Sequence, residues 1–274
     1  MKMDRQRPEY RALFISDLHL GSISCNVGEL QEFLHAHNSE QLYLVGDIVD
    51  AWVAGGKKKF RQEHANVIRT LLGKAKHGSQ IFYCPGNHDA LLRRINGSEV
   101  GNILIDHEFV HTTLNGDRYL VVHGDLFDKS VTKFTSLAWI GAWLHEFNTS
   151  LTQSINQRRE KKDRKPINFA NNMKRLVKRA VKNLTNFDDS LLAAAESQGL
   201  QGVVCGHTHR PAMMVGANGG VYYNCGDWME HCTALVENWD GTLQLMKWNA
   251  QEGRLEPLIP ILKESEMASH SFVK

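Results

Sequence analysis

The sequence has no Cys-x-x-Cys pair, and its five cysteines, an odd number, are scattered along the chain. This pattern excludes a thiolate-rich structural zinc site and a framework of paired disulfides, and it favours reduced thiols in the cytosol. Residues 1–7 lack the apolar core of a signal peptide. No run of about 18 apolar residues is present to span a membrane. We therefore expect a cytoplasmic protein.

The sequence also lacks a large excess of either charge, since its formal net charge is only +2 at pH 7. The totals therefore do not favour a nucleic-acid-binding protein. The charge is unevenly placed, because residues 151–190 carry +7 and the remainder carries −5. With 274 residues and 42% hydrophobic content, the chain can bury one large core. We expect a single domain over residues 1–274.

The order of apolar segments predicts an α/β fold. We expect strands over 11–16, 41–46 and 80–84, alternating with helices over 27–37 and 60–77. In the second helix, Val67, Ile68, Leu71 and Leu72 are the expected buried positions. A short helix over 89–95 and a strand over 201–205 complete this part.

Turn signals predict a second, antiparallel part. Asn115-Gly116 favours a hairpin between strands over 108–114 and 117–122, and Asn218-Gly219 and Asp240-Gly241 favour two more. Residues 129–197 show only helical spacing, which predicts a helical insertion. A tail over about 249–274 closes the chain.

Five predicted strand ends carry side chains of the kinds that bind metals. The stretch Leu13–Gly21 places an Asp and a His, two residues apart, after an apolar strand, and four later stretches repeat the pattern. Ligands of open α/β sheets bind at the carboxyl ends of strands. The candidate metal ligands are Asp17, His19, Asp47, Asn87, His123, His207 and His209.

This donor set of carboxylate, amide and imidazole groups suits Mn²⁺, Zn²⁺ or Fe. Two cations about 3.5–4 Å apart need a bridging carboxylate, for which Asp47 is our candidate, and together they lower the pKa of a bridging water. His88 is the candidate catalytic residue that stabilises the transition state or protonates the leaving group, and Asp89 is expected to orient it.

The alternative to a metal site is that these are ordinary structural residues. A lone histidine at a strand end is usually an ordinary core or surface residue, and the glycines before Asp47, Asn87 and His207 can be turn glycines. The chain has fourteen histidines. Five repeats of one pattern nevertheless favour the metal site. We expect the histidines outside it to be His35, His37, His64, His77, His107, His111 and His270.

The motifs Asp17-x-His19, Gly46-Asp47, Gly86-Asn87-His88-Asp89, His123 and Gly206-His207-Thr208-His209 resemble the signature of the calcineurin-like metallophosphoesterases. The resemblance implies an αββα sandwich with a dinuclear site. Asp17, His19, Asp47 and His209 would hold one metal. Asp47, Asn87, His123 and His207 would hold the other, and His88 would be the catalytic histidine.

Within that superfamily the chain is similar to the UDP-2,3-diacylglucosamine diphosphatase group of lipid A biosynthesis. The shared features are residues 15–21, His123-Gly124-Asp125, the helical insertion after it, and residues 224–228. The chain has Gly-Asn-His-Asp where the best-known branch has Gly-Asn-Arg-Asp. It therefore resembles a second branch. This difference does not affect the expected metal ligands, but it leaves the exact substrate open.

In this group the insertion forms a lid over the substrate. Its apolar stripe suits acyl chains, and a basic face suits phosphates or an anionic membrane surface, although such stripes are more often ordinary core and solvated surface. The candidate substrate contacts are Lys174, Arg175, Lys178 and Arg179. The sequence leaves open whether the protein also makes peripheral contact with the cytoplasmic face of the inner membrane.

The resemblance implies a hydrolase with two divalent metals, expected to be Mn²⁺ with Zn²⁺ or Fe as alternatives. It would cleave UDP-2,3-diacylglucosamine or a similar nucleotide-linked lipid to UMP and a lipid phosphate. One alternative is a phosphoesterase with another soluble or amphiphilic substrate. A non-catalytic scaffold is an alternative of a different class, but such relatives should have broken ligand sets, and this ligand set is complete. No nucleic-acid partner is expected, because no aromatic platform accompanies the basic residues.

Overall fold

The computed structural model describes residues 9–50, 60–128 and 187–258. The chain divides into two units, one of Met1–Gly124 with Leu191–Lys274 and the other of Asp125–Ser190. The described part of the second unit includes the short 3-10 helix η3 (Asp125–Phe127). All strands, α1 and α2 belong to the first unit. The predicted insertion lies largely outside the described residues, and both the insertion and the single domain stay predictions.

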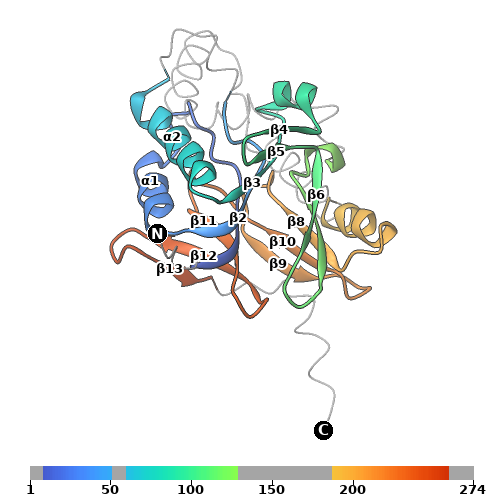
Figure 1. Ribbon diagram of the computed structural model, residues 1–274. Coiled ribbons are helices and arrows are strands. Elements are labelled where there is room, and N and C mark those ends of the chain that lie inside the picture. Colours follow the sequence, from blue (N-terminus) through green and yellow to red (C-terminus); the bar gives the residue numbers. More distant parts are fainter. Residues whose placement is uncertain (1–8, 51–59, 129–186, 259–274) are drawn as a thin grey trace, which may run out of the picture. The chain divides into compact units, whose positions relative to one another are not determined.

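The first sheet has eight strands in the order β13-β12-β11-β1-β2-β3-β5-β4 (Figure 1). Its parallel core is β1 (Tyr10–Ile15), β2 (Ser39–Val45), β3 (Gln80–Cys84) and β5 (Ile103–Ile105). Helices α1 (Val27–Ala36) and α2 (Gln62–Lys76) connect the first three of these strands, as the alternation of segments predicted. The remaining strands, all antiparallel to their neighbours, are β4 (Ser98–Val100), β11 (Thr233–Glu237), β12 (Leu243–Asn249) and β13 (Arg254–Pro257).

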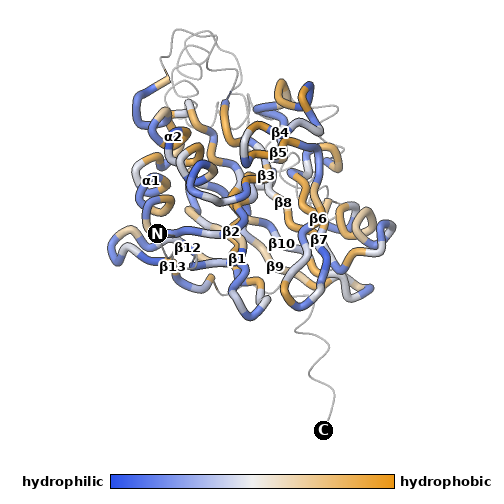
Figure 2. Tube along the Cα trace, viewed as in Figure 1, coloured by the Kyte–Doolittle hydropathy of each residue, from blue (hydrophilic) through white to orange (hydrophobic). Residues whose placement is uncertain are grey.

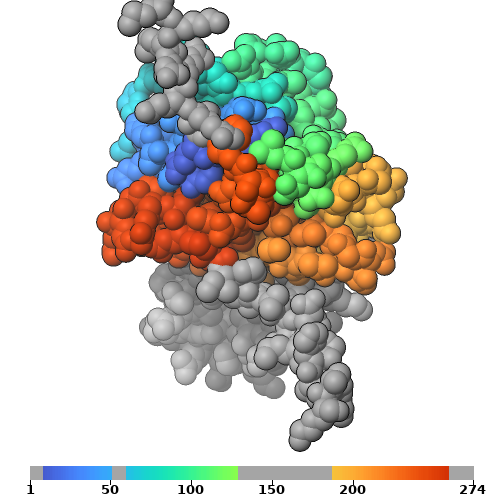
Figure 3. Space-filling view, turned by 60° about the horizontal axis from the view of Figure 1, so that its bottom comes forward, coloured from blue at the N-terminus to red at the C-terminus, as the bar shows by residue number. Residues whose placement is uncertain are grey.

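Segments from the two ends of the sequence are neighbours in this sheet. Strand β1 pairs with β11 on one side and with β2 on the other. The N-terminal and C-terminal parts of the chain accordingly lie side by side on the surface in Figure 3. Strand β13 occupies part of the predicted tail.

The second sheet has the order β6-β7-β8-β10-β9. Its strands are β6 (Glu108–Thr112), β7 (Arg118–Val122), β8 (Gly202–Cys205), β9 (Ala212–Val215) and β10 (Val221–Asn224). The predicted hairpin turns are present between β6 and β7, β9 and β10, and β11 and β12. The expectation of a purely antiparallel part was wrong, because β8 runs parallel to both β7 and β10. The long connection from β7 to β8 permits this crossover.

Strand alternation builds two cores. Along β1, Leu13 and Ile15 face the helices, whereas Ala12 and Phe14 face the second sheet. Because both faces of the central strands are covered, these strands read as continuous apolar runs, and hydrophobic residues concentrate in them (Figure 2). On the other sheet, Leu192 of a helical segment lies against the glycines of the β9–β10 hairpin. The layers therefore form the αββα sandwich that the resemblance implied.

Helix α2 buries Val67 and Leu71 as predicted and packs Ile68 partly against the core, but it exposes Leu72. Its buried residues are His64, Val67, Leu71 and Ala75, while Leu72 is 52% exposed. The prediction for Leu72 was therefore wrong, because the buried stripe follows steps of three and four residues from His64. Strands β4 and β5 were not predicted, because each has only three residues and so shows no clear pattern. The short helix expected over 89–95 is the 3-10 helix η2 (Ala90–Ile95).

A buried polar network joins the two sheets. His111 on β6 contacts the Tyr43 hydroxyl on β2 at 3.0 Å and the Glu237 carboxylate on β11 at 2.9 Å. The Leu114 N–H donates to the other carboxylate oxygen of Glu237 at 2.8 Å. These contacts satisfy groups that would be costly to bury alone.

Within the described ranges, no helix combines the length and the apolar composition needed to cross a membrane.

Candidate metal centre

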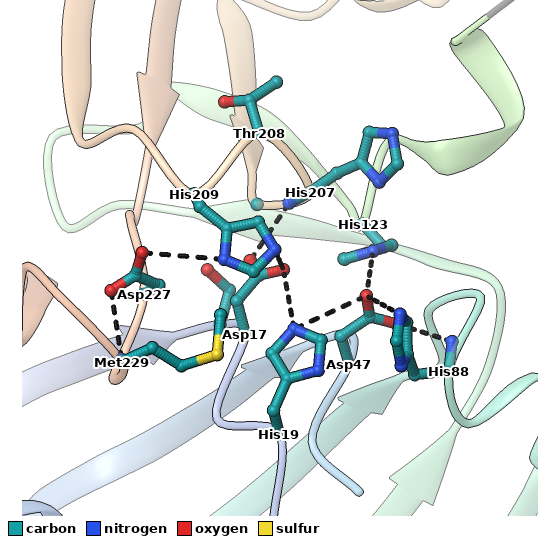
Figure 4. Close-up of polar contacts among 12 residues, drawn as sticks. Asp17, His19, Asp47, His88, His123, His207, Thr208, His209, Asp227 and Met229 are labelled. Atoms are coloured by element: carbon teal, nitrogen blue, oxygen red, sulfur yellow. Dashed lines mark hydrogen bonds and ion pairs between the residues drawn. The ribbon is translucent and has the colours of Figure 1, made fainter. Parts of the chain in front are cut away.

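The predicted ligand-bearing segments lie side by side at the carboxyl ends of parallel strands of both sheets (Figure 4). Backbone hydrogen bonds tie them together. Asp17 N–H donates to the Gly46 carbonyl at 3.0 Å, and His19 N–H donates to the Asp47 carbonyl at 2.9 Å. Gly206 N–H donates to the His123 carbonyl at 3.1 Å. The segments thus form one rigid platform for polar side chains.

Their side chains meet in overlapping groups. Asp17, His19 and His209 form one group whose ligand atoms lie within 4.8 Å of one another, and Asp17, Asp47 and His123 form another. His209 Nε2 is 3.4 Å from Asp17 Oδ1, and His123 Nε2 is 3.4 Å from Asp47 Oδ2. Because Asp47 Oδ2 is also 3.9 Å from His19 Nε2, Asp47 lies between histidines of the two predicted sites.

The backbone of the ligand residues is left-handed. Six non-glycine residues in the described part of the chain have positive φ, and five of them are predicted ligands: Asp17 (53°), His19 (47°), Asp47 (53°), His207 (68°) and His209 (58°). This conformation is uncommon outside glycine and carries a cost of about 1–3 kcal/mol per residue. Through these turns beyond the end of β1, the side chains of Asp17 and His19 converge on the same group of ligand atoms.

Three glycines next to the ligands are required by close contacts. A Cβ on Gly86 would lie 2.2 Å from Asp47 Oδ1, and one on Gly206 would lie 2.5 Å from Asp17 Oδ2. A Cβ on Gly46, which also has φ +79°, would lie 2.2 Å from the His123 ring. These residues are therefore not interchangeable turn glycines, since a side chain at any of them would displace a ligand.

Several buried polar atoms at the centre have no hydrogen-bond partner. They are Asp17 Oδ1, His19 Nε2 and Asn87 Oδ1. Such atoms are rare in folded proteins, because burial removes their water without replacing it. Carboxylate, imidazole and amide donors also match the preferences of divalent cations such as Mn²⁺ and Zn²⁺. The residues present therefore fit a divalent metal centre.

Asp50 is a residue of the site that sequence reasoning missed. Its Oδ1 lies 2.8 Å from Nδ1 of His19 and 2.8 Å from Nδ1 of His88. His123 Nδ1 has an equivalent partner, the Val45 carbonyl at 3.0 Å. An Nδ1–H that is held in this way leaves Nε2 with its lone pair toward the cluster. The only sequence signal was a second acidic residue three positions after Asp47.

The contacts of Asp89 differ from the one that we predicted. We expected it to orient His88, but the contact to His88 Nδ1 comes from Asp50. Asp89 instead accepts hydrogen bonds from Gly86 N–H at 2.6 Å, Ile48 N–H at 2.9 Å and the Tyr83 hydroxyl at 2.6 Å. Asp89 therefore links the loop that carries Asp47 to the loop that carries Asn87. The contact that orients His88, which we predicted for Asp89, is made by Asp50.

Interactions with the surrounding histidines favour the ionised form of the carboxyl groups of Asp47 and Asp50. Burial alone raises the pKa of Asp47, but the imidazoles of His123, His88 and His19 more than offset this and hold it well below its usual range. Burial likewise opposes ionisation of Asp50, yet its contacts with His19 and His88 lower its pKa to about 2. Burial lowers the pKa of His88, but Asp50 and Asp47 raise it above the usual value.

His207 lies beside the other candidate ligands, with its ring centroid 5.3 Å from that of His123. The backbone N–H of His207 donates to Asp17 Oδ2 at 3.0 Å. The candidate substrate contacts Lys174, Arg175, Lys178 and Arg179 fall outside the described residues, so they stay predictions.

The sequence matches one family model and several curated proteins. The family model for calcineurin-like phosphoesterases matches residues 10–211, a range that contains every candidate ligand. The UDP-2,3-diacylglucosamine hydrolase of Chromohalobacter salexigens is 31% identical over 73% of this chain and 80% of that protein. The enzyme of the same name from Shewanella pealeana is 26% identical over 84% of this chain and 95% of that protein. The crystal structure of Vps29 from Chaetomium thermophilum aligns with a TM-score of 0.45 at 11% identity, over 90% of this chain and 94% of that one.

Proposed function

We propose that this chain, which belongs to the calcineurin-like phosphoesterase family of metal-dependent hydrolases, cleaves the diphosphate of UDP-2,3-diacylglucosamine to UMP and a lipid monophosphate. The names of its curated relatives support this substrate. The structural observation that carries the hydrolytic part is the position of Asp47 between His19 and His123. The same centre holds three buried polar atoms without a hydrogen-bond partner, Asp17 Oδ1, His19 Nε2 and Asn87 Oδ1.

We assign the metal ligands as two sets that share Asp47. Asp17, His19, Asp47 and His209 hold one cation, and Asp47, Asn87, His123 and His207 hold the other. Mn²⁺ is the proposed metal, and Zn²⁺ or Fe are the alternatives, because oxygen and imidazole donors without a thiolate suit all three. When bound, two such cations lower the pKa of a shared water and neutralise charge on the phosphoryl oxygens.

His88 is the proposed catalytic residue. Its Nδ1 is held by Asp50 at 2.8 Å, and its Nε2 lies 4.0 Å from Asp47 Oδ2, at the border of the ligand cluster. Asp50 and Asp47 raise the pKa of this ring against the effect of burial, which favours the protonated form. In that form Nε2–H can donate to a phosphoryl oxygen as negative charge develops there. We assign Asp50 the role of positioning this ring and that of His19.

The lipid part of the proposal rests on the relatives and on the sequence outside the described residues. We infer that Lys174, Arg175, Lys178 and Arg179 contact the substrate phosphates or the anionic membrane surface. Peripheral contact with the cytoplasmic face of the inner membrane would give the enzyme access to its amphiphilic substrate.

The test is hydrolysis by metal-stripped protein that is resupplied with Mn²⁺. UDP-2,3-diacylglucosamine and bis-p-nitrophenyl phosphate are compared, and UMP release is measured directly. We expect UMP at a rate far above that of the generic ester, and loss of both activities with EDTA. Cleavage of the generic ester alone would overturn the lipid substrate and keep the phosphoesterase. No cleavage of either substrate by protein that binds Mn²⁺ would support a scaffold instead.

A further inference from the structure

The side chain of His209 is more exposed than those of two other candidate ligands, His19 and His123. Its side chain is 32% exposed, compared with 4% for His19 and 1% for His123. Packing therefore holds the His209 ring less firmly than the other two. Its ring stacks on that of His19 at a centroid distance of 5.1 Å, which restrains one face only. A further contact is needed to fix the direction of Nε2.

Asp227 supplies a contact on the far side of this ring. Its Oδ2 lies 3.5 Å from His209 Nδ1, while His209 Nε2 faces Asp17 Oδ1 at 3.4 Å (Figure 4). The two ring nitrogens thus meet different partners, as those of His19 do with Asp50 on one side and the cluster on the other. Asp227 is itself buried, with 2% of its side chain exposed.

The position of Asp227 is fixed by its own turn. Its Oδ1 accepts the N–H groups of Met229, Glu230 and His231 at 3.1, 2.8 and 2.9 Å. These bonds leave Oδ2 to face the rings of His209 and His231. Because one oxygen is anchored to the backbone, the other has a defined direction.

The residues around Asp227 also hold the metal-site loops. The buried Asn224 side chain donates to the Gly206 carbonyl at 2.7 Å and to Thr208 Oγ1 at 3.0 Å, next to His209 in sequence. Ser16 Oγ donates to the Gly226 carbonyl at 2.8 Å, and Trp228 N–H donates to the Asp17 carbonyl at 3.2 Å. The segment 224–228 therefore contacts both the Asp17 and the His209 loops.

We propose that Asp227 is the positioning residue of His209, holding its Nδ1–H so that Nε2 is directed at the metal bound with Asp17 and His19. The inference rests on the proposed metal centre but not on the identity of the substrate. A carboxylate behind a ligand histidine fixes its tautomer and orientation and raises its basicity. Asp227 is the counterpart, for His209, of Asp50 for His19.

The test is a two-site titration of metal-free protein with Mn²⁺ by calorimetry, which needs no substrate. Asp227→Asn retains an oxygen to accept the three backbone N–H groups but places an amide toward His209. We expect about 10- to 100-fold weaker binding at one site and unchanged binding at the other. Asp240→Asn, in an exposed hairpin turn, is the matched control and should leave both affinities unchanged.

A double-mutant cycle separates positioning from general support of the fold. In a His209→Ala background, Asp227→Asn should weaken Mn²⁺ binding no further, because the ring that it orients is gone. Equal losses in the two backgrounds would overturn the proposal. If Asp227→Asn does not fold, Asp227→Ser keeps a hydroxyl for the turn and removes Oδ2, and wild-type affinity in that variant would also overturn it. Absence of UMP release by wild-type protein that binds Mn²⁺ at both sites would count against the lipid substrate and leave the role of Asp227 unaffected.

Discussion

The Nδ1 atom of His88 lies 2.8 Å from the Oδ1 atom of Asp50 in a largely buried pair. The two residues are 38 positions apart in sequence and come from loops that follow different strands. This contact sets the direction of the ring that we propose acts on the substrate. It also links the ionisation of the two groups to the stability of the fold.

We expect Asp50 to stabilise metal-free protein most strongly between about pH 4 and pH 6.5. Its folded pKa of about 2 lies below the unfolded value of 3.8, so its contribution is present above pH 4 and is lost as pH falls toward 2. The folded pKa of His88 lies above the unfolded value of 6.5, so the contribution of this ring is lost as pH rises through the folded value. Urea unfolding of wild type and Asp50→Asn in EDTA at pH 3, 5 and 8 measures the difference, and a gap that does not change with pH would contradict the pair.

Asp47→Ala and His88→Ala should separate metal binding from catalysis. Asp47 lies between both ligand sets, so its loss should abolish binding of both cations and all activity. His88→Ala should leave the metal content nearly unchanged and lower kcat by about 10²- to 10⁴-fold. Metal analysis after desalting, with kinetics on bis-p-nitrophenyl phosphate, tests both. Equal metal loss in the two variants would contradict the separate roles.

Gly86→Ala should impair the site, whereas Gly73→Ala should not. The new Cβ at residue 86 would lie 2.2 Å from Asp47 Oδ1 and 2.6 Å from its backbone nitrogen, so Asp47 must move. We expect at least about a 10-fold loss of Mn²⁺ affinity. Gly73, within α2, has no atom within 4 Å of its added Cβ. Its replacement should stabilise the helix by up to about 1 kcal/mol. Wild-type metal affinity in Gly86→Ala would show that the loop adapts freely.

Glu237→Ala should destabilise the sandwich by about 3 kcal/mol, because it leaves His111 and the Leu114 N–H buried without their acceptor. Glu256→Ala is the control. Its carboxylate is 42% exposed in a surface ion pair, so the change should cost less than about 1 kcal/mol. The free energies of unfolding come from urea titration, and equal values for the two variants would contradict a structural role for the His111 network.

Several elements could be predicted from signals within a single segment of the chain. Asn115-Gly116 has the residues that a tight hairpin requires, and the apolar runs of β1 and β2 mark strands buried on both faces. The candidate ligands were found because each follows such a strand. Strand ends of a parallel sheet meet at one edge, so chemistry repeated along the chain becomes proximity in space.

The partner that each side chain contacts could not be predicted from the segment that carries it. Asp89 is next to His88 in sequence but braces backbone N–H groups, while Asp50 reaches His88 from another loop. Asp227 likewise contacts His209 across a turn and a pair of strands. The exposure of Leu72 depended on how α2 rotates on the sheet. Sequence patterns record periodicity within one segment, whereas these contacts depend on the approach of separate segments, which the packing of the whole domain sets.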